Sequence, residues 1–128
     1  MVRVALMLPG ATATFALVDF LVDTGAMVTT LSPVDAASPV GIDPSRLAEG
    51  LPRATPSSIR SVGGEVRTFA APAIYGFRHD GSVQVMNGQI VAIPLTNGNG
   101  WLPSLLGWDL LEQFKLTTDY RTRTVTLE

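Results

Sequence analysis

The sequence predicts a mostly β domain, and three observations lead to this fold class. Short apolar and β-branched runs follow one another along the chain, separated by Gly, Pro and Asn. Signals for helices are few and short. With 128 residues, 46% of them hydrophobic and 16% charged, the chain has the length and the apolar content of a single domain. We therefore expect one folded unit over residues 1–128, with no linker and no internal repeat.

The strands are expected where the apolar runs lie. These runs cover residues 2–8, 15–22, 28–31, 66–70, 73–77, 82–86 and 89–95. The dipeptides Pro9-Gly10 and Asp80-Gly81 each stand between two consecutive runs, where they predict turns of antiparallel hairpins. Near the C-terminus, residues 115–118 and 123–127 flank a polar tetrapeptide and predict a closing hairpin.

Helix signals occur at three places. Ser32-Pro33 and Asp43-Pro44 each place a capping side chain before a proline, which predicts one or two helical turns after each cap. The clearest signal covers residues 109–114, where Asp109 can cap free amides and the apolar side chains fall on one face. We therefore expect one short helix near the C-terminus.

Composition excludes several functional classes. Nine basic against eleven acidic residues give a net charge of -2, and no basic cluster points to nucleic acid as a partner. The absence of cysteine excludes disulfides, thiolate metal sites and a cysteine nucleophile. The single histidine, His79, adjoins the Asp80-Gly81 turn and is interpreted as an exposed loop residue. We expect no metal and no cofactor.

No targeting segment is visible at the N-terminus. A basic stretch followed by a long apolar run is missing, and Asp19 and Asp23 interrupt the most apolar window. We expect no membrane segment. The localisation stays open between the cytoplasm and a soluble domain of a longer protein.

The motif with the clearest chemistry is Val22-Asp23-Thr24-Gly25-Ala26, which stands between two apolar runs. A strand ending here would deliver an acid into a tight turn. Asp can act as a base or an acid, the Thr hydroxyl can bond across a symmetric partner loop, and Gly lets a peptide backbone come close. The alternative interpretation is a surface turn, because the tripeptide also arises by chance.

Three segments resemble one protein family. The run Leu21-Val22-Asp23-Thr24-Gly25-Ala26 resembles the active-site loop of retroviral and bacterial retropepsin-like aspartic proteases. Leu105-Leu106-Gly107-Trp108-Asp109-Leu110-Leu111-Glu112-Gln113-Phe114 is similar to the apolar strand, glycine and short helix of that family. Ser61-Val62-Gly63-Gly64-Glu65 is a weaker match to the tip of its flap hairpin. Together they span nearly the whole chain and suggest a bacterial-like member.

The resemblance implies a closed, antiparallel β-barrel of the acid protease type that becomes an enzyme only as a homodimer. The mechanism needs two Asp-Thr-Gly loops and the chain has one, so a second subunit has to supply the other. Asp23, Thr24 and Gly25 are then the catalytic residues of an aspartic endopeptidase. Two Asp23 carboxylates share a proton, and the ionised one activates a water that attacks the peptide carbonyl.

The resemblance also implies where a peptide substrate would lie. Its backbone would contact Ala26 and a flap formed by residues 62–64, namely Val62, Gly63 and Gly64. An ordinary β-turn is the alternative for these glycines. Leu102 and Pro103, in a loop rich in Gly and Asn, are candidates for side-chain pockets. Trp101 is interpreted as a partly buried anchor of that loop.

Two other functions stay open. A proteolytically silent relative could keep the fold and grip a peptide as a dimeric binding or scaffold module. A monomeric β-barrel that binds a small apolar ligand belongs to a different class. Cleavage of unstructured peptides, with an Asp23→Asn control, and the molecular mass at several concentrations separate the three.

The sequence departs from the family pattern at two positions. Many retroviral members have an arginine after the glycine of the second motif and an acid four residues beyond the catalytic one. This chain has Trp108 and Met27 there. Because losing one partner would leave a buried charge unpaired, the joint replacement indicates an apolar contact in place of an ion pair. We therefore expect Trp108 to pack near Met27 and to steady the active-site loop.

Overall fold

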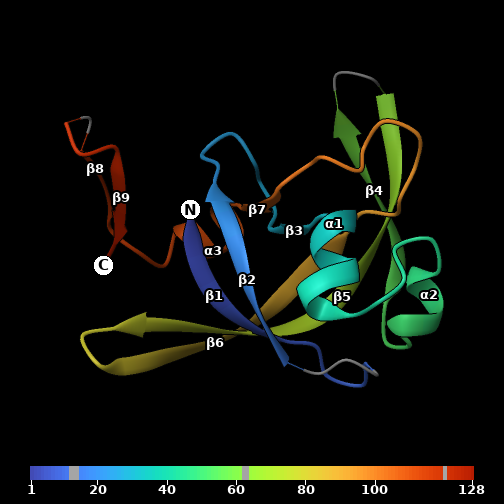
Figure 1. Ribbon diagram of the computed structural model, residues 1–128, viewed down its shortest axis with the longest axis horizontal. Helices are drawn as coiled ribbons and strands as arrows, with labels where there is room; N and C mark the ends of the chain where they lie inside the picture. Colours follow the sequence, from blue (N-terminus) through green and yellow to red (C-terminus); the bar gives the residue numbers. More distant parts are fainter. Residues whose placement is uncertain (12–14, 62–63, 120) are drawn as a thin grey trace.

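The protein is mostly β, as the sequence predicts, with 49% strand and 13% helix. The computed structural model describes residues 1–11, 15–61, 64–119 and 121–128. A ring of six strands closes into a barrel (Figure 1). In their order around the ring they are β1 (Val2–Met7), β2 (Phe15–Val22), β7 (Ser104–Leu106), β3 (Thr30–Leu31), β6 (Ser82–Ala92) and β5 (Gly64–His79), which pairs with β1 again.

The remaining elements attach to this ring. Strand β4 (Thr55–Ser61) pairs with β5, and β8 (Leu116–Asp119) with β9 (Thr124–Leu127) forms a separate hairpin. Figure 1 shows this hairpin standing to one side of the barrel. The helical segments are α1 (Pro33–Asp35), the π-helical turn η1 (Ala36–Val40), α2 (Leu47–Gly50) and α3 (Trp108–Leu111). Within the described ranges, no helix is long and apolar enough to span a membrane.

Most strand pairs are antiparallel, and two short pairs are parallel. Strands β1 and β2 form the first expected hairpin, and β5 and β6 form the second. The parallel pairs are β2 with β7 and β3 with β6. The β2–β7 register places Val22 opposite Leu106. Strand pairing thereby brings the Asp-Thr-Gly motif next to the second motif, more than eighty residues later in the chain.

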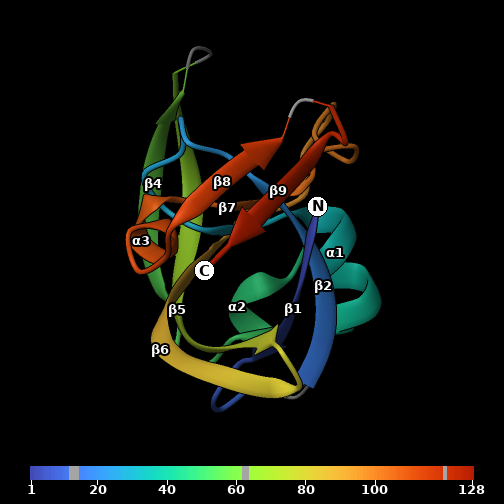
Figure 2. The same cartoon turned by 90° about the vertical axis from the view of Figure 1, so that its left-hand side faces the viewer.

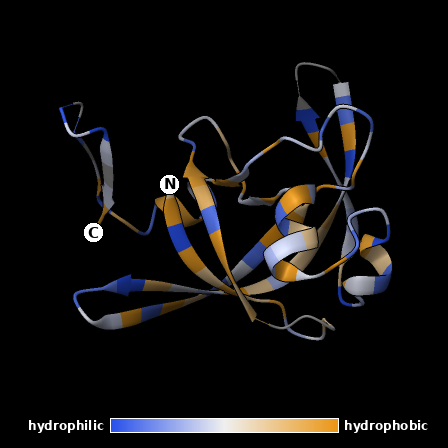
Figure 3. Ribbon diagram, viewed as in Figure 1, coloured by the Kyte–Doolittle hydropathy of each residue, from blue (hydrophilic) through white to orange (hydrophobic). Residues whose placement is uncertain are grey.

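The core lies between the strands of the barrel. Along β2, Ala16, Val18 and Phe20 are buried while the residues between them are exposed, which is the alternation expected of a strand with one face in the core. Figure 3 shows the apolar character of β1 and β2. The largest fully buried side chain is Tyr75 of β5, whose hydroxyl donates a hydrogen bond of 2.6 Å to the Gln89 carbonyl. A buried phenol needs such a partner.

Two pairs of expected strands are merged. Residues 66–70 and 73–77 belong to the single strand β5, which runs through Pro72 opposite Gln89. The runs 82–86 and 89–95 both fall mainly within β6, which ends at Ala92. Pro and Gly interrupt the apolar pattern but not the backbone, because paired residues on both sides hold the strands in register. Strand β4 was not expected, since its sequence is polar and contains Pro56.

Helix boundaries also differ from the expectation. Ser32 caps α1, with its hydroxyl accepting a bond from the Asp35 N–H as expected. After Asp43-Pro44 the chain makes a turn in which the Asp43 carboxylate accepts bonds from Ser45, and the helix begins only at Leu47. Helix α3 covers Trp108–Leu111 and not residues 109–114, so Asp109 lies inside its first turn and Gly107 is at the N-cap position. The Asp109 carboxylate still accepts a bond of 3.0 Å from the Leu110 N–H.

Candidate active site

The Asp-Thr-Gly loop begins where β2 leaves the barrel. The Asp23 N–H donates to the Leu106 carbonyl at 3.1 Å, which extends the β2–β7 pairing by one residue. A turn follows, closed by a bond of 3.1 Å from the Ala26 N–H to the Asp23 carbonyl. The Gly25 N–H donates to Asp23 Oδ1 at 2.8 Å. The Asp23 side chain is half-buried, and Thr24 and Gly25 are exposed.

The segment of residues 107–109, which we call the clamp, lies along this loop. The Trp108 N–H donates to the Ala26 carbonyl at 2.9 Å, and the Asp109 N–H donates to the Met27 carbonyl at 3.2 Å. The second motif therefore holds the first through backbone hydrogen bonds. This contact joins two segments that are far apart in the sequence.

Thr29 connects the loop to the clamp from inside the protein. Its side chain is fully buried. The hydroxyl donates to Asp109 Oδ1 at 2.7 Å and accepts from the Gly107 N–H at 3.1 Å, while the Thr29 N–H donates to Asp109 Oδ2 at 3.1 Å. Charge-assisted bonds of this kind are stronger than neutral ones. Sequence reasoning gave Thr29 no role, because its neighbour Thr30 is the same residue type and nothing local tells the two hydroxyls apart.

Gly107 is required by a close approach of the two segments. A Cβ atom on this residue would lie 2.5 Å from both the backbone carbon and the backbone oxygen of Val28. Backbone atoms cannot move aside as the end of a side chain can. Any other residue at this position would therefore push the clamp away from the loop.

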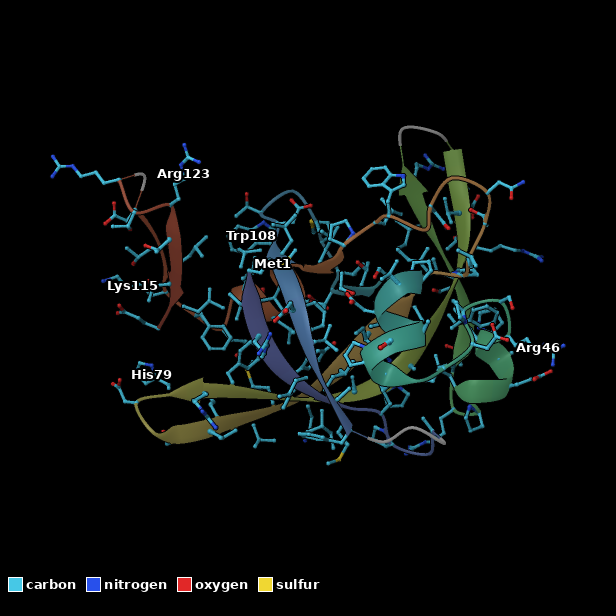
Figure 4. The ribbon with its side chains drawn as sticks, in the orientation of Figure 1. Met1, Arg46, His79, Trp108, Lys115 and Arg123 are labelled. Atoms are coloured by element: carbon cyan, nitrogen blue, oxygen red, sulfur yellow. The ribbon has the colours of Figure 1, made fainter. Side chains whose placement is uncertain are left out.

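Trp108 contacts the Asp-Thr-Gly loop through its side chain. Its indole Nε1–H donates to the Thr24 carbonyl at 2.6 Å. Met27 is 75% exposed and Trp108 39% exposed, and the expected packing of the thioether against the indole stays a prediction beside this hydrogen bond. Figure 4 labels Trp108 at the side of the barrel where β2 ends. An indole can donate a hydrogen bond but has no atom that accepts one, so a backbone carbonyl is a suitable partner.

The other expected site residues are only partly placed. Val62 and Gly63 lie outside the described residues. Gly64 begins β5 opposite Ser61 with φ +111°, a conformation that favours glycine. Leu102 and Pro103 are half-buried. Trp101 is 76% exposed, so the expectation that it anchors the loop by partial burial is wrong.

Three of these segments lie at one end of the molecule. In both Figure 1 and Figure 2, the loop after β2, the last residues of β4, the first residues of β5 and residues 93–103 are all in the upper half of the picture. The Asp80-Gly81 turn lies at the opposite end. The loop after β2 and residues 93–103 therefore lie on the same side of the molecule, although no hydrogen bond within the described part of the chain joins Leu102 or Pro103 to Asp23.

No family model matches the chain, and a search of curated proteins finds no match. Among solved structures, the EIAV protease complexed with the inhibitor HBY-793 is similar. It shares 17% sequence identity with a TM-score of 0.46, over 87% of this chain and 85% of that chain. At this level the likeness carries no information about chemistry, which depends on the residues of the site.

One oxygen of the Asp23 carboxylate is open. Asp23 Oδ2 accepts no hydrogen bond from the described residues, so this oxygen is available to another group. Cavities of about 570 and 450 Å³ are lined by residues of β1, β5 and β6 among others, and not by Asp23. In the described ranges, no cluster of three or more His, Asp or Glu side chains is arranged to hold a metal ion. The Asp23 carboxylate therefore lies on a loop that is exposed at Thr24 and Gly25 and is held by hydrogen bonds to the clamp.

Proposed function

We propose that the protein is an aspartic endopeptidase in which two copies of the chain form one active site. The observation that carries the proposal is the geometry of Asp23. One of its oxygens is bonded to the Gly25 N–H, the other has no partner in the described chain, and the loop is fixed by the clamp. A carboxylate held in one orientation and open on one side is what general acid–base catalysis needs.

The second copy supplies what the single chain lacks. Two Asp23 side chains facing each other across a two-fold axis cannot both be ionised at a separation of a few ångströms, so they share one proton. The ionised carboxylate takes a proton from a water, which attacks the carbonyl carbon of the peptide bond. The protonated carboxylate donates a hydrogen bond to the carbonyl oxygen and stabilises the tetrahedral intermediate.

The exposed Gly25 and the hairpin of β4 and β5 fit an extended peptide as substrate. Glycine leaves room for a peptide backbone next to Asp23. A strand-like substrate can add its backbone hydrogen bonds to those of the protein, as in other cases of β-strand addition. Ala26, residues 62–64, Leu102 and Pro103 are the proposed contacts.

The test combines an Asp23→Asn variant with subunit mixing. Unstructured peptides are incubated with the native chain, with Asp23→Asn, and with mixtures of both. We expect no cleavage by the variant, because the amide cannot ionise, while its circular dichroism and molecular mass stay native. In mixtures, a growing excess of Asp23→Asn should suppress the native activity, because mixed dimers carry only one carboxylate.

Other outcomes contradict the proposal in distinct ways. Activity proportional to the native chain in every mixture would show that one chain suffices. Peptide binding without cleavage would favour a silent binding module. A monomer mass at all concentrations, together with no peptidase activity, would favour the monomeric barrel.

Dilution gives a result that would support the proposal. If two chains form each active site and the dimer is weak, specific activity should fall on dilution in the micromolar range.

A further inference from the structure

Two hydrogen bonds meet on a single peptide group beside the candidate catalytic carboxylate. The Trp108 indole N–H donates to the Thr24 carbonyl at 2.6 Å. The Gly25 N–H donates to Asp23 Oδ1 at 2.8 Å. The Thr24 carbonyl and the Gly25 N–H belong to the same planar peptide unit. The indole, this peptide and the Asp23 carboxylate therefore form one continuous chain of hydrogen bonds.

Such a chain has two physical consequences. Because the peptide unit is rigid, holding its carbonyl oxygen also fixes the direction of its N–H. Hydrogen bonds in series polarise one another, so a donor at the carbonyl strengthens the bond that the N–H makes on the other side. The indole thereby acts on the orientation of Asp23 without touching it.

We propose that Trp108 is a positioning residue for Asp23, acting through the Thr24-Gly25 peptide. Its backbone N–H, bonded to the Ala26 carbonyl, fixes the other end of the same turn. Trp108 stands where the resemblance would place an arginine, so this chain steadies the loop with a neutral donor. The catalytic consequence rests on the function proposed above, whereas the hydrogen-bond relay does not.

The relay is tested first without any activity. The chain has two tryptophans, so a Trp101→Phe variant leaves Trp108 as the only indole. Likewise, Trp108→Phe leaves Trp101 as the only indole. In ¹⁵N-labelled samples we expect the Trp108 indole N–H to exchange with solvent far more slowly than the Trp101 indole N–H. The reason is that Trp108 is hydrogen-bonded at 2.6 Å, whereas the Trp101 side chain is 76% exposed. The Gly25 amide resonance should shift in Trp108→Phe and stay in place in Trp101→Phe.

The catalytic consequence is tested by kinetics on the same pair of variants. Trp108→Phe keeps an aromatic ring and removes the donor, so we expect kcat to fall by roughly tenfold with KM little changed, because misplacing a reacting group costs rate and not binding. Trp101→Phe is the matched control with near-native kcat. Activities are compared at concentrations where both variants are dimeric and folded.

The two arms separate the inference from the proposed function. Fast exchange of the Trp108 indole, or an unmoved Gly25 resonance in Trp108→Phe, overturns the relay whether or not the protein cleaves peptides. An intact relay with kcat in Trp108→Phe equal to that of Trp101→Phe overturns the positioning role. Absence of peptidase activity in the native dimer overturns the proposed function and leaves the relay standing on its spectroscopic evidence.

Discussion

Replacing Thr29 by valine should destabilise the protein by about 3 kcal/mol, because this hydroxyl joins the residues that follow the Asp-Thr-Gly loop to the clamp. Valine has nearly the same shape, so the substitution removes the hydroxyl and leaves no cavity. The lost bond to the Asp109 carboxylate at 2.7 Å is charge-assisted, and such bonds contribute about 1.5–3 kcal/mol. The Gly107 N–H loses its acceptor at 3.1 Å, and an unpaired buried donor costs about 1–3 kcal/mol.

The measurement is equilibrium unfolding in urea at a fixed protein concentration, with Thr29→Ser as the matched control. Serine keeps the hydroxyl and loses one methyl group from a fully buried site, which costs about 1 kcal/mol. We expect the midpoint of Thr29→Val to fall well below that of Thr29→Ser, with the slope m unchanged. In thermal unfolding the valine variant should lose about 10 °C.

One result would refute this reasoning. If Thr29→Val is as stable as Thr29→Ser, the hydroxyl contributes no net free energy and the clamp is held by its backbone bonds alone. A changed slope m would mean that the denatured or native state has altered in compactness, and the comparison would then be repeated by hydrogen exchange of the Gly107 amide.

Two further predictions concern the clamp and the core. Gly107→Ala should cost about 1–3 kcal/mol and lower activity, because its Cβ would lie 2.5 Å from Val28 backbone atoms. Gly100→Ala, where the nearest atom is 3.8 Å away, is the control in the same unfolding assay. Burial, followed by the charge of Asp109, raises the pKa of the Tyr75 phenol, so the unfolded chain ionises first and stability should fall as pH rises above about 10. Tyr75→Phe should cost about 1 kcal/mol at neutral pH and lessen that alkaline loss, and an unchanged pH dependence would contradict the assignment.

Local sequence predicted the parts of the fold that depend on neighbouring residues. The Asp80-Gly81 turn joins β5 to β6, and Pro9-Gly10 forms a turn after β1 that is closed by a bond from the Ala11 N–H to the Leu8 carbonyl. The Ser32 cap forms as expected. Strand β4 was missed, since Thr55–Ser61 is polar and becomes a strand only through pairing with β5. The lengths of β5 and β6 were underestimated because their pairing with each other continues through Pro72 and Gly88, where the apolar pattern is interrupted.

The candidate site, too, was only partly predictable from the sequence. The motif around Asp23 and its link to the second motif were visible in the sequence, because both are short and their residue types have few other uses. The contacts that hold them together were not visible. Thr29 and Asp109 are eighty positions apart, and no local pattern signals that the hydroxyl of one meets the carboxylate of the other.

The sequence by itself determined the fold class and singled out Asp23 as the candidate acid, because alternation, turn residues and a motif are properties of adjacent positions. Only the tertiary structure decided how the acid is held. Parallel pairing of β2 with β7 places Gly107 against Val28 and the Trp108 indole on the Thr24 carbonyl. Such contacts arise when the barrel closes and brings distant backbone within hydrogen-bonding distance, and their geometry is a property of that closure and not of any single segment.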